Sequence, residues 1–314
     1  MLLYAIQRIG LSALILITSM VMLFTALKLI PGDPATIMLG SRASPEMRAR
    51  IAEELKLNDP VLTQLGTFFG RIAEGNLGTD LWSKRPVSQM VMESLPHTLI
   101  LIGAGLGWAV LIGVPLGCYS AVRRNSLADK LTGILSVATI SIPSFVVAIY
   151  LILVFAIQLN LLPVIGAGEK GDTWDQFLHL LMPAFALGLG WVGYLSRIVR
   201  ASMLEVMGEN HVRTARAFGL PEIRIVWSYA LRIAILPTIT LLAVAFGGLL
   251  SSAVFVESIF ARPGIGKLIV DAASARNFPV VQGGVLTTVA LFSLTMPIAD
   301  LLVAWLDPRI RARL

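Results

Sequence analysis

Long runs of apolar residues without Asp, Glu, Lys or Arg dominate the chain, and they predict membrane-spanning helices. A span needs about 20 apolar residues. In lipid only an α-helix satisfies its own backbone hydrogen bonds over such a run, and the period-two alternation of a β-barrel strand is absent. Six runs are long enough, and they cover residues 9–27, 98–122, 131–156, 177–196, 233–256 and 277–299, the last continuing to Leu306.

The first predicted span lies where a signal peptide would lie. Its apolar core is too long for a signal peptide. It is followed by Ile30-Pro31-Gly32-Asp33-Pro34, which lacks the small-x-small pattern of a cleavage site. We therefore expect an uncleaved helix.

Composition supports a protein that lies mostly in lipid. Hydrophobic residues make up 56% of the chain, charged residues 14%, and the mean hydropathy is +0.80. Soluble domains carry about 25% charged residues. The net charge of +6 would suit a nucleic-acid partner unless the basic residues are explained by membrane topology. The chain has 1 cysteine, Cys118, so an intramolecular disulfide is excluded.

Basic residues are distributed unevenly between the short loops on the two sides of the membrane. Cytoplasmic loops of membrane proteins carry the excess of Lys and Arg. We therefore predict a multi-pass membrane protein with both termini in the cytoplasm, and no nucleic-acid partner. One side carries Arg8, Arg123, Arg124, Lys130, Arg197, Arg200, Arg213, Arg216, Arg224, Arg232, Arg309, Arg311 and Arg313, and the other only Lys170, Arg262, Lys267 and Arg276.

The connection between the first two spans predicts a small lobe outside the membrane. A first lobe helix is expected from Ser44-Pro45-Glu46, an N-cap followed by a proline and an acid, to about Leu57. A second is expected over 61–73, ended by Gly75, with Gly78, Pro86 and Pro96 breaking the chain before the next span. The predicted organisation is a first helix over 1–30, the lobe over 31–97 and a five-helix core over 98–314, including a cytoplasmic loop over 200–232.

This cytoplasmic loop contains a short predicted helix with small side chains. Residues 203–220 form the candidate helix, and Gly219 and Pro221 supply its C-terminal stop. A helix with small residues on one face suits docking into a groove of a partner protein. The pattern alone leaves a solvated amphipathic helix equally open.

Motifs that resemble enzyme sites have simpler explanations here. Gly188-Leu189-Gly190-Trp191-Val192-Gly193 matches a dinucleotide fingerprint literally, but it lies inside a predicted span and indicates close helix packing. Gly264-Ile265-Gly266-Lys267 lacks the first glycine and the hydroxyl of a phosphate-binding loop. His97 and His179 lie near the outer ends of two spans and make a weak metal-ligand set. We expect neither catalytic residues nor a cofactor in this chain.

The cytoplasmic loop resembles the signature loop of permease subunits of ABC importers. The resemblance is carried by Arg213-Thr214-Ala215-Arg216-Ala217-Phe218-Gly219-Leu220, and further matches occur in the same order along nearly the whole chain. It points to the first permease subunit of the dipeptide/oligopeptide/nickel group. The general signature begins Glu-Ala-Ala, where this chain has Arg213, Thr214 and Ala215, and its glycine-to-proline spacing is shorter; both departures fit the peptide-type branch. Other matches are Pro31-Gly32-Asp33-Pro34, Gly75-Asn76-Leu77-Gly78, Glu257-Ser258-Ile259-Phe260, Pro263-Gly264-Ile265-Gly266 and Asp307-Pro308-Arg309.

The resemblance implies the fold of a type I importer permease, a location in the bacterial inner membrane and an alternating-access mechanism. It implies four kinds of partner: a second homologous permease, two ATPase subunits that hold ATP and Mg²⁺, an extracytoplasmic solute-binding protein, and the lipid bilayer. The residues it assigns to ATPase coupling are Glu205, Glu209, His211, Arg213, Thr214, Ala215, Arg216, Ala217, Gly219 and Leu220. Those it assigns to an outer gate or binding-protein contact are Glu257, Phe260, Pro263, Gly264 and Gly266.

Three classes of function remain to be compared. The favoured one is a non-catalytic permease subunit that forms half of a pathway for di- or oligopeptides or similar small solutes, with nickel chelates and glutathione still open. A self-contained secondary transporter would show more ionisable residues in its spans, or an inverted repeat. A membrane-embedded enzyme would need a set of catalytic residues within the spans, and none is evident.

Overall fold

The computed structural model describes residues 2–29, 44, 46, 53 and 59–306. Over these residues the chain is helical, with one isolated β-bridge between Thr79 and Pro86. Most of the lobe helix expected from Ser44 to Leu57 lies outside the described residues, as does the Asp307-Pro308-Arg309 motif. The second lobe helix is confirmed: α4 spans Val61–Ala73, and Gly75 follows it with a φ of +74°.

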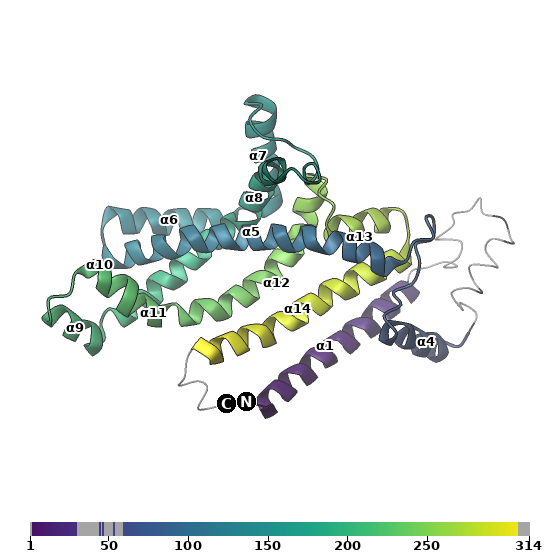
Figure 1. Ribbon diagram of the computed structural model, residues 1–314, viewed down its shortest axis with the longest axis horizontal. Helices are drawn as coiled ribbons and strands as arrows, with labels where there is room; N and C mark the ends of the chain where they lie inside the picture. Colours follow the sequence, from purple (N-terminus) through teal and green to yellow (C-terminus); the bar gives the residue numbers. More distant parts are fainter. Residues whose placement is uncertain (1, 30–43, 45, 47–52, 54–58, 307–314) are drawn as a thin grey trace.

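Long helices lying roughly side by side form the body of the molecule (Figure 1). Within the described residues, five are long and apolar enough to cross a membrane, and a bent pair makes six if it is counted as one span. This agrees with the prediction of about six spans. The five long helices are α1 (Leu2–Lys28), α5 (Val87–Val122), α8 (Thr173–Val206), α12 (Leu236–Ile259) and α14 (Phe278–Leu306).

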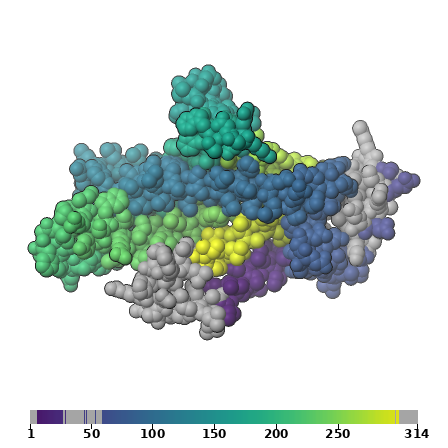
Figure 2. Space-filling model, viewed as in Figure 1, coloured from purple at the N-terminus to yellow at the C-terminus, as the bar shows by residue number. Residues whose placement is uncertain are grey.

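The third predicted span, 131–156, is not one continuous helix. It consists of α6 (Leu127–Ser141), α7 (Ser144–Leu151) and the π-helix η1 (Ile152–Gln158), and the two parts meet at an angle of 94°. Pro143 lies at the break, and the preceding Ile142 is extended, with φ −91° and ψ 119°. A proline disfavours the helical conformation in the residue before it, so the helix ends there. Figures 1 and 2 show the segment after the bend standing out from the bundle.

Two helix boundaries differ from the prediction because polar residues continue the helices beyond the apolar runs. α5 begins at Val87, so residues 87–97 belong to this helix and Pro96 lies inside it instead of breaking the chain. α8 extends past Ser196 to Val206. Pro96 lies more than two turns into α5, so it removes one backbone hydrogen bond from the helix interior, and the helix continues through it.

Glycines allow α5 and α8 to pack closely. A Cβ on Gly117 of α5 would lie 2.7 Å from the carbonyl oxygen of Ser196, and one on Gly113 would lie 3.0 Å from that of Val192. A Cβ on Gly188 would overlap the backbone of Gly105, and one on Gly193 would overlap Thr139. The glycines of the apparent dinucleotide fingerprint thus serve helix packing, as predicted.

The remaining helices gather at the two ends of this body. α9 (Asn210–Ala217), α10 (Glu222–Arg224), the π-helix η2 (Ile225–Ala230) and α11 (Leu231–Ala234) form one end. α4 and α13 (Ile265–Ser274) lie at the other. Figure 1 also places the start of α1 and the end of α14 toward the α9 end. Both ends of the described chain therefore lie on the same side as the candidate coupling loop.

Candidate functional site

The loop between α8 and α12 does not form the single helix predicted over 203–220. α8 ends at Val206, a turn containing Gly208 follows, and α9 covers Asn210–Ala217. Glu205 therefore lies on the last turn of the long helix, and Glu209 is the N-cap residue of α9. The candidate coupling helix is α9, shorter than predicted and turned away from α8.

One face of α9 is built into the bundle. Val212 and Ala215 are buried with Met203 and Val206 of α8 and Ile225 of η2 in one apolar cluster. Ala215 was predicted to leave room for a partner, and this part of the prediction is wrong. Its small side chain lets α9 lie close to the rest of the chain.

The opposite face of α9 is open to solvent. Arg213, Thr214, Arg216 and Ala217 are exposed, while His211 and Leu220 are partly buried. Phe218 at the C-cap is 82% exposed and Ile223 is 69% exposed. Neither of these two apolar residues is among the residues predicted for ATPase coupling. The sequence does mark both positions as apolar side chains in an otherwise polar segment. Phe218 directly precedes the glycine that ends the helix, and Ile223 follows Pro221 by two residues.

A Schellman-type cap ends α9. Gly219 has a φ of +73°, its N–H donates to the carbonyl of Arg216 at 2.9 Å, and the N–H of Leu220 donates to that of Ala215 at 3.3 Å. Glycine adopts this left-handed conformation without the steric cost that a Cβ brings. The predicted stop at Gly219 is confirmed, and the cap leaves Phe218 on the surface.

One ion pair and one contact between a histidine and a carboxylate flank the exposed face. Arg216 Nε lies 2.6 Å from Glu222 Oε1, and His211 Nδ1 lies 3.1 Å from Glu209 Oε2. Arg216 was expected to pair with a partner protein, but in the isolated chain its guanidinium bonds to Glu222. Because both side chains of this pair are largely exposed, it adds little to stability. It can exchange for a charge on a partner.

A charged cluster secures the part of α8 that leads to this loop. The Asp129 carboxylate on α6 accepts hydrogen bonds from Arg200 Nε at 2.6 Å, Arg200 Nη2 at 2.8 Å and the backbone N–H of Asn125 at 2.9 Å. The Ser120 hydroxyl of α5 donates to the same carboxylate. Three helices therefore meet at one buried carboxylate.

At the other end of the molecule Glu257 is fully buried. Its Oε1 accepts a hydrogen bond from the Thr98 hydroxyl at 2.6 Å, and its Oε2 accepts from the N–H of Gly266 at 2.8 Å and of Lys267 at 3.2 Å. The N–H of Ile265 donates to Thr98 Oγ1 at 2.8 Å. The N-terminus of a helix favours a negative charge, so Glu257 holds the start of α13 against α5 and α12.

Most residues predicted for the outer gate or binding-protein contact are buried inside this chain. Glu257 is 0% exposed and Phe260 1%, and Gly264 and Gly266 are also buried. These residues shape the loop from inside, and Pro263 is the exposed member of the predicted set. A Cβ on Gly264 would overlap the Glu257 carboxylate, so this position requires glycine for space.

Arg262 lies beside this carboxylate in an unusual setting. It is 3% exposed, and its Nε and Nη1 atoms have no hydrogen-bond partner in the described part of the chain. Burial lowers the pKa of Arg262, and the nearby Glu257 charge partly offsets this effect. Burying a guanidinium without a full set of hydrogen bonds is unfavourable in free energy, and the outer loop carries this cost at Arg262.

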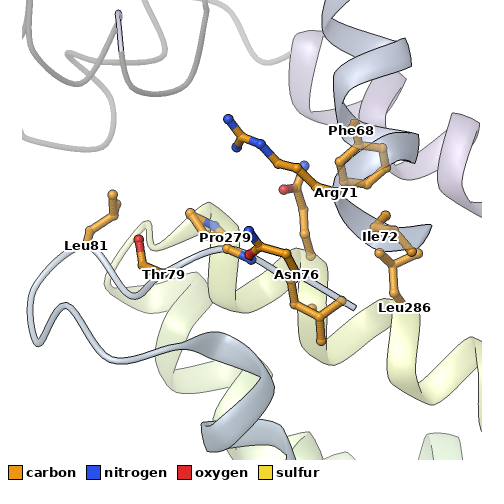
Figure 3. Close-up of a pocket in the computed structure, with 12 residues that line it drawn as sticks. Phe68, Arg71, Ile72, Asn76, Thr79, Leu81, Pro279 and Leu286 are labelled. Atoms are coloured by element: carbon orange, nitrogen blue, oxygen red, sulfur yellow. The ribbon is translucent and has the colours of Figure 1, made fainter. Parts of the chain in front are cut away.

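A second polar cluster holds the loop before α5. Burial alone would raise the pKa of Asp80, but hydrogen bonds from Ser83, Asn277 and the Trp82 backbone hold it below its usual value. Figure 3 shows the neighbouring cavity of about 270 Å³ between α4 and α14, lined among others by Phe68, Arg71 and Leu286. Phe68 also contacts Phe24 of α1, with ring centroids 5.9 Å apart. The described lobe helix is therefore packed on two spans.

No group of three or more His, Cys, Asp or Glu side chains within the described ranges could hold a metal ion. His179 Nδ1 instead lies 2.8 Å from the carbonyl oxygen of Asp175, one turn earlier in α8. The arrangement as a whole offers an exposed helix for a partner at one end and a rigid loop at the other.

Comparison with known proteins agrees with this arrangement. Residues 113–312 match the family described as binding-protein-dependent transport system inner membrane component, and residues 1–102 match the N-terminal membrane component of the same systems. A solved structure of the MetNI methionine ABC transporter, in inward-facing conformations, contains a chain with the same fold. The TM-score is 0.58 at 16% identity, and the match covers 70% of this chain and 97% of that one.

Curated relatives are similar over their full length. The glutathione transport system permease protein GsiC of Pectobacterium atrosepticum is 37% identical over 312 residues, with 99% of each chain covered. The dipeptide transport system permease protein DppB of Alkalihalophilus pseudofirmus is 34% identical over 332 residues, covering 99% of this chain and 100% of that protein. The chain therefore belongs to the family of inner membrane components of binding-protein-dependent transport systems, and it is a multi-pass permease subunit of an ABC importer.

Proposed function

We propose that this permease forms half of the translocation pathway of an importer of short peptides. Its relatives are named for glutathione and for dipeptides. Glutathione is itself a tripeptide, so both names describe small solutes with peptide groups and free carboxylates. We assign the same class of solute to this chain.

The proposed assembly contains a second, homologous permease, two ATPase subunits that bind ATP and Mg²⁺, and an extracytoplasmic solute-binding protein. The N-terminus, the C-terminus and α9 are placed in the cytoplasm, because arginines are concentrated on that side of the predicted spans. This chain itself is proposed to carry out no catalysis.

The observation that carries this proposal is the surface of α9. Its inner face is buried in the bundle, whereas Arg213, Arg216 and Phe218 stand on its outer face. An exposed aromatic residue together with exposed arginines is typical of a protein interface, in which aromatic residues and Arg are enriched. A force applied to this face would pass into the bundle through Val212 and Ala215, which are buried in one apolar cluster with residues of η2 and α8.

Uptake of radiolabelled solutes into vesicles that contain the full assembly tests the function. Vesicles with the complete set of subunits are expected to accumulate dipeptide or glutathione when ATP is supplied inside the cytoplasmic compartment, and vesicles without this chain are not. A nickel chelate transported in place of both peptides would contradict the solute class. Uptake by this chain alone, driven by an ion gradient, would contradict the ABC assembly in favour of a secondary transporter.

A further inference from the structure

A basic cavity lies beside the first turn of α9. It has a volume of about 540 Å³, within the range of roughly 300–1,000 Å³ that small-molecule sites usually have. In the part of the chain that the structure describes, no acidic residue lines it. Its lining consists of His211, Arg224, Ser228, Tyr229, Arg232 and Ile233.

The π-helix η2 brings these side chains to one face. In a π-helix the backbone bonds run from residue i to i+5, so residues four and five apart lie close to one another on the surface. Arg224, Ser228 and Arg232 are four apart, and Tyr229 follows Arg224 by five. The opposite face of η2, with Ile225, Val226 and Ala230, is buried in the apolar cluster under α9.

The cavity offers hydrogen-bond donors that the described chain leaves without an anion. Arg224 and Arg232 are exposed, and no Asp or Glu in the described part of the chain lies within ion-pair distance of either. The Nδ1 atom of His211 faces Glu209, whereas its Nε2 atom is buried and has no partner in the described residues. The planar guanidinium group matches the geometry of a phosphate group.

The rim of the cavity is apolar and aromatic. Tyr229, which is 41% exposed, and Ile233, which is 43% exposed, belong to the lining, and the membrane span α12 begins at Leu236. Tyr and Trp concentrate at the level of the lipid headgroups. A free inorganic anion would gain nothing from such a rim, whereas a lipid would place its headgroup on the arginines and its glycerol and acyl groups on the rim.

We propose that this cavity binds the phosphate of an anionic phospholipid, of the phosphatidylglycerol class, from the cytoplasmic leaflet. The placement in that leaflet rests on the orientation given in the proposed function. Basic pockets at the cytoplasmic ends of spans bind anionic headgroups in other membrane proteins. Because His211 belongs to α9, the bound lipid contacts the first turn of the candidate coupling helix.

Photo-crosslinking of lipid to the full-length chain tests this site without any transport measurement. The chain is placed in nanodiscs of phosphatidylethanolamine and phosphatidylcholine that contain a small fraction of photoactivatable phosphatidylglycerol. Mass spectrometry then measures the crosslinked peptides. We expect label on the segment 224–233, and a loss on the order of tenfold in the variant with Arg224→Gln and Arg232→Gln.

The matched control removes two equally exposed charges from the end of α5, as Arg123→Gln with Arg124→Gln. This control is expected to keep the label. The single variant Arg232→Lys is expected to keep part of it, because the positive charge remains while the planar, forked arrangement of guanidinium donors is lost. Equal label in all variants would overturn the site. Full competition by inorganic phosphate, or equal labelling by photoactivatable phosphatidylcholine, would overturn the assignment to an anionic lipid.

A failed transport assay leaves this result unchanged, because labelling needs neither ATP nor partner subunits. Conversely, a chain that transports peptides but takes no label at 224–233 keeps the proposed function and loses the lipid site.

Discussion

Arg200 on α8 donates two hydrogen bonds to the Asp129 carboxylate on α6, at 2.6 and 2.8 Å, across 71 residues of sequence. Asp129 is 7% exposed, and it also accepts hydrogen bonds from Ser120 and Asn125. This pair joins the turn between α5 and α6 to the helix that carries α9. It therefore forms a fixed support for the candidate coupling helix.

Removing one partner of this pair should destabilise the protein. We expect Arg200→Gln to cost about 1–3 kcal/mol, because Asp129 stays buried with its charge partly unpaired. The measurement is the thermal unfolding midpoint in detergent. The matched control is Arg197→Gln, an exposed arginine one turn earlier on the same helix.

The double variant Asp129→Asn with Arg200→Gln should recover part of the loss, since it removes the uncompensated charge. A double variant as unstable as the sum of the single variants would show that the two residues do not interact.

Glycine at position 264 is predicted to be essential for packing. Gly264→Ala would force the Glu257 carboxylate away from the start of α13, so we expect destabilisation of about 1–3 kcal/mol, the usual cost of overpacking. The control is Gly103→Ala on α5, because a Cβ there meets no atom within 4 Å. Equal melting temperatures for both variants would argue against the tight packing at Gly264.

The end of α9 is predicted to couple ATP hydrolysis to uptake. Gly219→Leu places a side chain at a φ of +73°, with a local cost of about 1–2 kcal/mol. A Cβ at this position meets no atom of the chain within 4 Å, so membrane insertion should survive. We expect loss of solute-stimulated ATP hydrolysis and weaker co-purification of the ATPase subunits. Wild-type uptake by this variant would remove the end of α9 from the mechanism.

Exchanging the charges of Arg216 and Glu222 distinguishes a role of Arg216 within this chain from a role at the surface of an ATPase subunit. Arg216→Glu is expected to abolish stimulated hydrolysis, because it repels Glu222 and any acidic group of an ATPase subunit. The variant with both Arg216→Glu and Glu222→Arg restores the pair within the chain. If the restored pair recovers full activity, the role of Arg216 is confined to this chain. We expect continued loss, since the partner surface would still meet the wrong charge.

The orientation of the chain can be tested by labelling single cysteines from outside the cell. Cys118 is buried and is replaced by serine in the background. We expect Lys170→Cys to react with an impermeant thiol reagent in intact cells, and Ile223→Cys to react only after the membrane is opened. Both positions are exposed, so failure to react would report sidedness and not burial. External labelling of Ile223→Cys would reverse the proposed topology.

The sequence by itself determined the features that depend on local physics. Apolar runs predict the spans, because lipid leaves the backbone no other hydrogen-bond partner. The bounds of α4 and the stop at Gly219 follow from glycine and proline signals. The glycines at 188 and 193 indicate close packing, which the contacts with Gly105 and Thr139 confirm.

Only the tertiary structure decided which residues meet. Pro143 is a signal for a break in the helix. The 94° angle between the two parts also depends on the helices that α6 and α7 pack against. Glu257 reads as a loop residue at the end of a span, and its burial becomes evident only when Thr98 and the start of α13 are beside it. Ala215 reads as an exposed small residue, yet it is buried in an apolar cluster with residues of α8 and η2. Such contacts join residues far apart in the chain, and a single sequence records each residue's chemistry without recording its neighbours in space.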